Sequence, residues 1–136
     1  MTAEAITYPD ETAWLEGRRA GIGASDAATV LGVSPWASPL GLYASKLGLV
    51  DFVAETERMK WGKRLEAELA RAYAEESGRE LADPGRFTIH RSTEHPFMLA
   101  TLDRIVHDPA RGPGALEVKM TDVAKGDEWA EEPPVF

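Results

Sequence analysis

Apolar residues recur at helical spacing in one long stretch of the chain. The repeating positions are Leu65, Leu69, Ala72 and Tyr73. A repeat of three or four residues is typical of a helix with one buried face. Gly78 follows the stretch and is a residue at which helices commonly end. The pattern predicts a helix over residues 55–77.

A period of two marks residues 114–120. Alternate side chains of a strand face opposite sides of a sheet. Glu117 and Lys119 therefore stand together on one face, about 7 Å apart. The residues expected to face a core on the other side are Leu116, Val118 and Met120.

A second apolar run, over residues 97–106, contains Asp103. A turn-rich segment, residues 108–114, separates this run from the strand that follows it. The two runs therefore predict a hairpin in which Asp103 lies beside Glu117. Residues 80–90 predict an earlier strand, interrupted by an Asp-Pro-Gly turn. The order is then one long helix followed by three strands.

Shorter elements are expected before the long helix. Ser25 is a suitable N-cap for a helix over residues 26–31, and a short helical or turn segment begins at Trp14. A further helix is expected from Ser38 through Lys46, ending at Gly48. Its predicted core-facing stripe is Leu40, Tyr43 and Leu47. Residues 1–12 show no periodicity and predict a loose arm.

The chain shows no internal repeat and no low-complexity linker, which predicts a single domain over residues 1–136. The acidic, proline-ended tail has Trp129 as its one expected anchor. The expected parts are the arm at 1–12, an N-terminal loop and helices at 13–54, a core at 55–120 and the tail at 121–136.

Two carboxylates beside a lysine make a candidate Mg²⁺ site for phosphodiester chemistry, formed by Asp103, Glu117 and Lys119. A solvent-exposed strand face with a cross-strand charge pair explains the same residues, and the Glu-x-Lys triplet alone favours that ordinary interpretation. Glu66 lies next to the apolar stripe of the long helix. A carboxylate there either is paired or binds a cation, or it packs its stem and extends its head into water.

A second candidate site precedes the first predicted helix. Gly21 and Gly23 lead into Ser25 and follow Arg18 and Arg19. A glycine loop that enters a helix N-terminus behind two arginines suits an anion. Ordinary turn chemistry accounts for such glycines more often, so both interpretations stay open.

Composition limits the function classes. With 136 residues, 43% hydrophobic and 28% charged, the chain is typical of a soluble globular domain. A net charge of −8 argues against a surface that coats nucleic acid, but it is compatible with a nuclease, since metal ligands are themselves acidic. The absence of cysteine, of an apolar run of about 18 residues and of a signal peptide predicts a cytoplasmic protein with no membrane partner.

Four stretches, taken in order, resemble a known family. They are residues 14–26 with GIGASD, residues 34–49 with SPWASPLGLYASKLGL, residues 61–66 with WGKRLE, and LATLD at 99–103 followed by LEVK at 116–119. The chain resembles the YqaJ-like viral recombinase family, phage-type exonucleases related to lambda exonuclease. Such proteins are bacterial or phage-encoded. The resemblance implies an α/β (α+β) restriction-endonuclease-like PD-(D/E)xK core, in which a helix precedes a three-stranded sheet.

The resemblance also assigns roles. Asp103 and Glu117 would be the principal Mg²⁺ ligands, with Mn²⁺ as a substitute. The carbonyl of Val118 would be a further ligand, and Glu66 an outer or second-metal ligand. Lys119 would orient or activate the attacking water and stabilise charge on the phosphate.

The same resemblance implies that the N-terminal loop binds the terminal phosphate of a DNA end. Arg18, seven residues before Ser25, is the better match for the family's arginine, and Arg19 is the alternative. The implied partners are a duplex DNA end, a single-strand annealing protein and further copies of the chain.

Two departures from the family stand out. Leu102 and Arg104 flank Asp103 where the family has proline and glycine. Arg104 is expected to point to the opposite face and to leave the site undisturbed. The family also continues beyond a stretch like residues 129–136 into a further helix and strand. We therefore expect those two core elements to be missing, and the chain alone to fold but cleave poorly. We also expect it to self-associate or to pack its tail over the uncovered face.

The sequence thus predicts a Mg²⁺-dependent DNA exonuclease domain of phage recombination type, which hydrolyses phosphodiester bonds from a duplex end. Three alternatives remain. One is another PD-(D/E)xK endonuclease or repair nuclease. The second is a non-catalytic remnant of the fold that binds DNA or a partner protein. The third is a structural domain whose acids are solvated.

Overall fold

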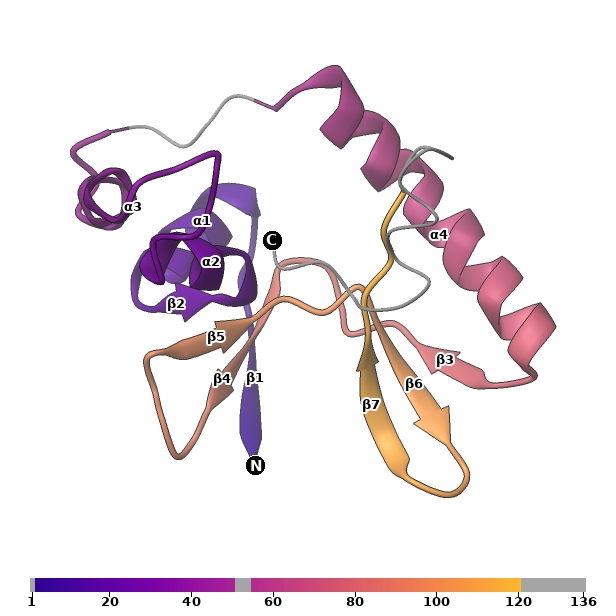
Figure 1. Cartoon of the computed structure of the whole chain (residues 1–136). Helices are drawn as coiled ribbons and strands as arrows, with labels where there is room; N and C mark the ends of the chain where they lie inside the picture. The colour runs from indigo at the N-terminus through magenta and orange to yellow at the C-terminus, as the bar shows by residue number, and fades with distance from the viewer. Residues whose placement is uncertain (1, 51–54, 121–136) are drawn as a thin grey trace. The chain divides into compact units, whose positions relative to one another are not determined.

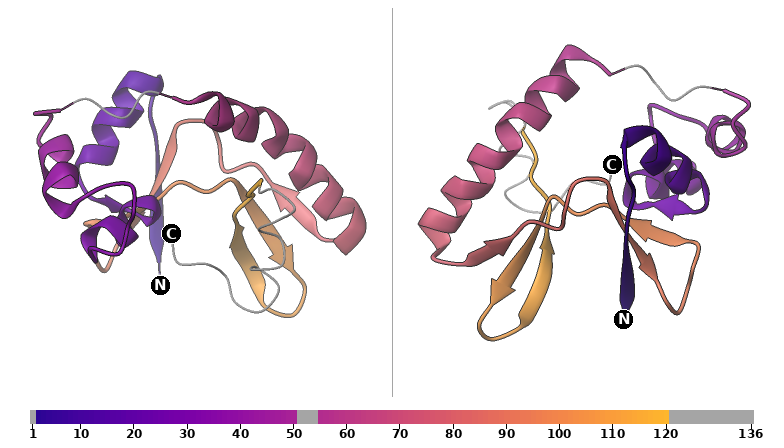
Figure 2. Two further views of the ribbon diagram at one scale, coloured as in Figure 1. Left: turned by 45° about the horizontal axis from the view of Figure 1, so that its top comes forward. Right: turned by 180° about the vertical axis from the view of Figure 1, so that it is seen from behind.

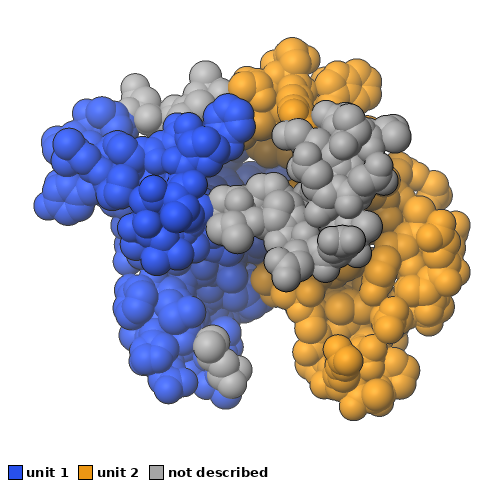
Figure 3. Space-filling model, viewed as in Figure 1, with its two compact units in different colours: residues 1–53, 85–101, 135–136 blue, residues 54–84, 102–134 orange. Residues whose placement is uncertain are grey.

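The computed structural model describes residues 2–50 and 55–120, which form a mixed α+β arrangement with two sheets (Figure 1). The contacts divide the chain into two compact units (Figure 3). Unit 1 contains residues 1–53 and 85–101, and unit 2 contains residues 54–84 and 102–134, with residues 135–136 assigned to unit 1. The single-domain organisation stays a prediction.

Unit 1 contains a four-stranded sheet in the order β1-β4-β5-β2. Its strands are β1 (Ala3–Thr7), β2 (Ile22–Gly23), β4 (Thr88–Ser92) and β5 (Met98–Ala100). β1 and β5 run antiparallel to β4, and β2 runs parallel to β5. The prediction of a loose arm over residues 1–12 is wrong, because β1 pairs with β4 along its whole length. Five residues are too few for periodicity to reveal a strand whose partner lies far along the chain.

The helices of unit 1 are α1 (Glu11–Arg19), the 3-10 turn η1 (Ala24–Asp26), α2 (Ala27–Val30) and α3 (Pro39–Lys46). Polar side chains cap the first and the last of them. The Asp10 carboxylate accepts the Ala13 amide at 2.9 Å, and the Ser38 hydroxyl accepts the Gly41 amide at 3.1 Å. The helix expected from Ser38 to Lys46 is confirmed.

The core of unit 1 forms around β4 and β5, where Ile89 and Leu99 are buried. Gly21 is required beside this core, because a Cβ there would lie 2.4 Å from the Phe97 carbonyl oxygen. The apolar stripe predicted on α3 is wrong. Its three members, Leu40, Tyr43 and Leu47, are exposed by 75%, 62% and 55%, whereas Leu42 is half-buried.

Unit 2 consists of a long helix followed by a three-stranded antiparallel sheet. The elements are α4 (Glu57–Ser77), β3 (Glu80–Ala82), β6 (Arg104–Asp108) and β7 (Gly112–Leu116), with the sheet order β3-β6-β7. The Thr56 hydroxyl caps α4 by accepting the Met59 amide at 3.3 Å, and Gly78 ends it with a φ of 66°. The predicted long helix is therefore confirmed.

Two predicted strands are divided between the sheets. The run 97–106 becomes β5 in unit 1 and β6 in unit 2, and the run 80–90 becomes β3 and β4. Left-handed backbone at Gly85 (φ 93°) and Phe87 (φ 59°) separates β3 from β4, which explains the second break.

The predicted hairpin is present as β6 and β7. Arg104 lies opposite Leu116, and Asp108 lies opposite Gly112 at the turn. One step beyond the paired residues, the same register brings Asp103 level with Glu117. β7 is shorter than predicted because it ends at Leu116.

Unit 2 has a thin core in its described part. Ala70 is its one buried apolar side chain there, and Leu69 is 40% exposed. The helix and the strands predict that residues 55–120 share a continuous apolar interior, and this prediction is wrong for the described residues. Figures 1 and 2 show β7 and the described residues that follow it leading toward α4. Trp129 and the rest of the expected tail lie outside the described residues.

No helix in the described ranges combines the length and apolar character needed to cross a membrane.

Candidate metal and phosphate-binding sites

Asp103 precedes β6 and is fixed by the strand segment opposite. Its Oδ2 accepts a hydrogen bond from the Val118 amide at 2.7 Å, and the residue is half-buried. The bond continues the hairpin contact beyond the last paired residues. It brings the predicted acid against the Glu-x-Lys segment.

A hollow of about 360 Å³ lies beside α4 in unit 2. Its lining residues are Arg58, Met59, Gly62, Lys63, Glu66, Leu69, Asp103, Val118, Lys119 and Met120. Four of the five residues predicted for the metal site, Glu66, Asp103, Val118 and Lys119, thus line one hollow. Glu117 is not part of this lining.

Each of the three predicted carboxylates has a protein partner. Asp103 accepts the Val118 amide, Glu66 pairs with Arg104 at 3.0 Å, and Glu117 pairs with Lys119 at 2.5 Å. Within residues 2–50 and 55–120, no three acidic or histidine side chains converge as a metal-binding group. The donors fit Mg²⁺ chemically, since all are oxygens, but a cation would have to displace these partners.

Arg104 lies inside this network, and the prediction that it leaves the site undisturbed is wrong. Its Nη1 donates to Glu66 Oε1 at 3.0 Å and also to the carbonyl oxygen of Asp103. Strand alternation places only the base of a side chain. The long arginine side chain folds back over its own backbone to reach α4. A clue was present in the sequence, since an arginine stands where the family has glycine.

Further cations line the hollow. Lys63 pairs with Glu55 at 2.7 Å, and this hydrogen bond lowers the pKa of the Glu55 carboxyl. Arg58 and Lys63 were not predicted as site residues. They lie about two turns and one turn before Glu66 on α4, so extending the helical face from Glu66 toward the start of the helix would have found them.

The predicted phosphate loop lies in unit 1. Arg18 Nη2 donates to Ser25 Oγ at 3.3 Å, and the guanidinium carbon lies 5.0 Å from the centre of the Trp14 ring. The structure therefore brings together the two residues predicted to bind a terminal phosphate. Arg19 pairs instead with Glu16 on its own helix at 2.6 Å.

Asp26 and Lys46 complete this loop, and neither was predicted. Asp26 Oδ2 accepts the Gly23 amide at 2.9 Å and lies 2.7 Å from Lys46 Nζ, with both side chains 15% exposed. Lys46 also donates to the Arg18 carbonyl at 2.9 Å. The prediction that Ser25 caps the helix over residues 26–31 is wrong, since Ser25 lies within η1 and Asp26 is the N-cap of α2. The carboxylate of Asp26 already accepts the Gly23 amide, so this loop amide is not free to bind an anion.

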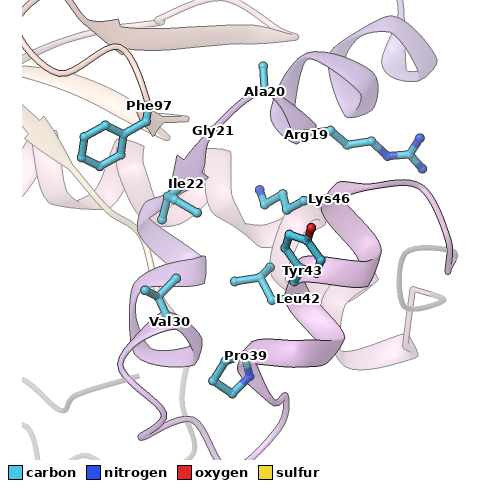
Figure 4. A pocket seen from close by; sticks show the side chains of 10 residues that line it. All are labelled: Arg19, Ala20, Gly21, Ile22, Val30, Pro39, Leu42, Tyr43, Lys46 and Phe97. Atoms are coloured by element: carbon cyan, nitrogen blue, oxygen red, sulfur yellow. The ribbon is translucent and has the colours of Figure 1, made fainter.

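An apolar hollow of about 380 Å³ adjoins the same loop (Figure 4). Figure 4 shows Val30 of α2 and Leu42 of α3 facing each other across it, with Ile22 above. The stem of Lys46 lines it while its ammonium pairs with Asp26. The hollow thus borders the loop, and the charge of Lys46 between them is compensated by Asp26.

The chain matches the YqaJ-like viral recombinase domain over residues 13–133. It belongs to this family. This confirms the resemblance seen in the sequence. Both candidate sites of this YqaJ-like domain lie within the matched residues.

One relative is the "Uncharacterized protein YqaJ" of Bacillus subtilis (strain 168), which is 36% identical over 121 residues. The match covers 88% of this chain and 36% of that protein, so the chain spans about a third of its relative. No solved structure matches the chain.

Proposed function

We propose that this YqaJ-like domain is a Mg²⁺-dependent DNA exonuclease domain of phage recombination type, built on a PD-(D/E)xK core and hydrolysing phosphodiester bonds from a duplex end. One observation carries the proposal. The bond from the Val118 amide to Asp103 brings an acid against the Glu-x-Lys segment, beside a hollow that Glu66 also lines. Membership of a viral recombinase family supports it.

The residues divide into ligands and a positioning cation. Asp103, Glu117 and the Val118 carbonyl would hold Mg²⁺ or Mn²⁺, with Glu66 as an outer ligand. A bound cation supplies charge neutralisation at the phosphate and a lower pKa for water. Lys119, whose ammonium lies against Glu117, would orient the water and stabilise charge on the phosphate oxygens.

The loop of unit 1 would bind the terminal phosphate. Arg18 offers a guanidinium for a charge-assisted hydrogen bond, and Ser25 offers its hydroxyl. Stacking of Arg18 against Trp14 restrains the guanidinium. The pairing of Asp26 with Lys46 reduces the repulsion that a free carboxylate would exert on the anion.

A non-catalytic module that binds DNA or a partner protein is the second candidate. The observation that favours it is the engagement of Glu66, Asp103 and Glu117 by protein donors. A single-strand annealing protein and further copies of the chain are the proposed partners under either candidate.

A nuclease assay with two duplex substrates separates these candidates. Linear 5′-phosphorylated duplex and covalently closed circular duplex are incubated with the chain at high protein concentration, in Mg²⁺, Mn²⁺ or chelator. The proposal expects slow, metal-dependent release of nucleotides from the linear duplex alone. Cutting of the circle would support an endonuclease, and DNA binding without cleavage would support the non-catalytic module.

A further inference from the structure

We infer that Arg104 is a built-in competitor for the divalent cation, because it neutralises Glu66 until metal displaces it. The inference rests on the proposed metal site. It assigns to Arg104 a role in setting metal affinity, although strand alternation directs this residue away from the site.

The contacts of Arg104 are those of a specific ion pair. Its Nη1 lies 3.0 Å from Glu66 Oε1 and also donates to the Asp103 carbonyl. The two side chains are 19% and 30% exposed. The pair of Arg71 with Glu68 on the same helix is 68% and 61% exposed. The Arg104–Glu66 pair is therefore much less screened by water than that surface pair.

Competition follows from charge and from one shared atom. Glu66 Oε1 accepts from Arg104 and belongs to the carboxylate that would bind the cation. Asp103 and Glu66 are the two carboxylates among the residues that line the hollow, and Arg104 pairs directly with Glu66. Changing Arg104 leaves in place the cations of the lining, Arg58, Lys63 and Lys119. The affinity of an oxygen site for a divalent cation rises with the charge of its ligands. Loss of the guanidinium should therefore strengthen metal binding, and it should do so through Glu66.

A purely structural role for Arg104 predicts the opposite sign. If the residue only ties β6 to α4, its removal loosens Glu66 against Asp103 and weakens metal binding. The direction of the change in affinity therefore separates the two roles, independently of catalysis.

The test measures Mn²⁺ binding to the full chain by electron paramagnetic resonance and Mg²⁺ binding by calorimetry. Arg104→Gln should tighten binding about tenfold, since one opposing charge is removed from the site. Arg104→Lys keeps the charge but loses the planar donor set and should tighten binding less. Arg71→Gln removes the same charge from a surface pair of the same unit and should leave the affinity unchanged.

A double-mutant cycle assigns the effect to Glu66. In a Glu66→Gln background, Arg104→Gln should no longer tighten binding. Should Arg104→Gln prove unfolded by circular dichroism, the comparison of Arg104→Lys with the unchanged chain decides the sign.

Unchanged or weaker binding in folded Arg104 variants would overturn the inference. The inference would also be overturned if Arg104→Gln still tightened metal binding in the Glu66→Gln background, or if no variant bound metal. The proposed function fails separately. If the Arg104 variants bind metal more tightly but no variant cleaves DNA, the nuclease proposal fails and the competition stands. If the chain cleaves DNA but the Arg104 variants bind metal with unchanged affinity, the competition fails and the nuclease proposal stands.

Discussion

The carboxylate of Asp103 and the backbone amide of Val118 form a 2.7 Å hydrogen bond just beyond the paired residues of the β6–β7 hairpin. A side-chain oxygen thus takes the place that a backbone carbonyl would have in a continued ladder. The acid is held by the main chain of the segment that carries Glu117 and Lys119. Its position therefore does not depend on a flexible partner side chain.

Neutralising the two principal acids should abolish cleavage. Asp103→Asn or Glu117→Gln, in the full-length protein, is expected to reduce the rate at least about a hundredfold, because each removes ligand charge. An asparagine oxygen can still accept the Val118 amide, so the fold should be retained. Nucleotide release from linear duplex is the measurement. Asp108→Asn, at the other end of the same hairpin, is the control and should cleave normally. Normal cleavage by both acid variants would show that the site is misassigned.

Lys119→Ala should separate metal binding from chemistry. Removing the ammonium takes a positive charge away from Glu117, so metal binding should persist, while the rate falls about 10²–10³-fold. Calorimetry and single-turnover cleavage are measured together. Lys60→Ala, which breaks an exposed pair with Glu57, should change neither quantity. A variant at position 119 that keeps its rate would remove the lysine from the mechanism.

Glu66→Gln should be milder than either principal acid. Water can replace an outer ligand, and Arg104 already neutralises much of this carboxylate. We expect a cleavage rate between those of the unchanged protein and Asp103→Asn in the same assay. A loss as complete as that of Asp103→Asn would make Glu66 a principal ligand.

Arg18→Ala should weaken recognition of a phosphorylated end. Its guanidinium contacts Ser25, so the preference for 5′-phosphorylated over unphosphorylated duplex should fall about tenfold while binding to internal DNA changes little. Fluorescence anisotropy with both ends gives the ratio. Arg91→Ala removes an exposed arginine of unit 1 that pairs with Glu4 and is the matched control. Equal loss for the two substrates would favour ordinary turn chemistry at this loop.

The turn of the β6–β7 hairpin should respond to acid. Hydrogen bonds from the amides of Ala110 and then Arg111 lower the pKa of Asp108 below its ordinary value of 3.8, with Arg79 contributing. A depressed pKa stabilises the fold at neutral pH, and that stabilisation is lost as the pH falls through and below this ordinary value. Thermal unfolding of the unchanged chain and Asp108→Ala should therefore differ at pH 7 and converge in acid. A difference that is constant with pH would exclude this linkage.

Short stretches of sequence predicted the elements whose structure depends on residues close together in the chain. The span of α4, its Gly78 end and the turn between β6 and β7 all lie within short windows of sequence. The predicted buried stripe of α4 is wrong, because Leu69 and Ala72 are exposed and Ala70 is the buried residue. β1 was missed because its stability comes from pairing with β4, and a strand of five residues carries little signal of its own. The run 97–106 gave no sign that it would serve two sheets.

The candidate site was predictable where backbone register decides the outcome. The hairpin formed as expected, and the bond from the Val118 amide places Asp103 against the segment that carries Glu117 and Lys119. Contacts between long side chains were not predictable, because the pairs of Arg104 with Glu66 and of Lys46 with Asp26 depend on tertiary packing and on how each side chain folds. Charge alone could not assign these partners among 38 charged residues, the sum of 15 basic and 23 acidic ones.

Neither compact unit is encoded by one continuous stretch of codons. The codons for residues 85–101 belong with unit 1 but interrupt those of unit 2. A gene broken after codon 84 supplies α4 and β3 without β6 and β7, and a gene begun at codon 102 supplies the hairpin without its helix. A single crossover between related genes inside this region would therefore join halves of unit 2 from two parents. Selection should then favour inheritance of Glu66 and Arg104 as a matched pair, because these two side chains form the ion pair between the halves.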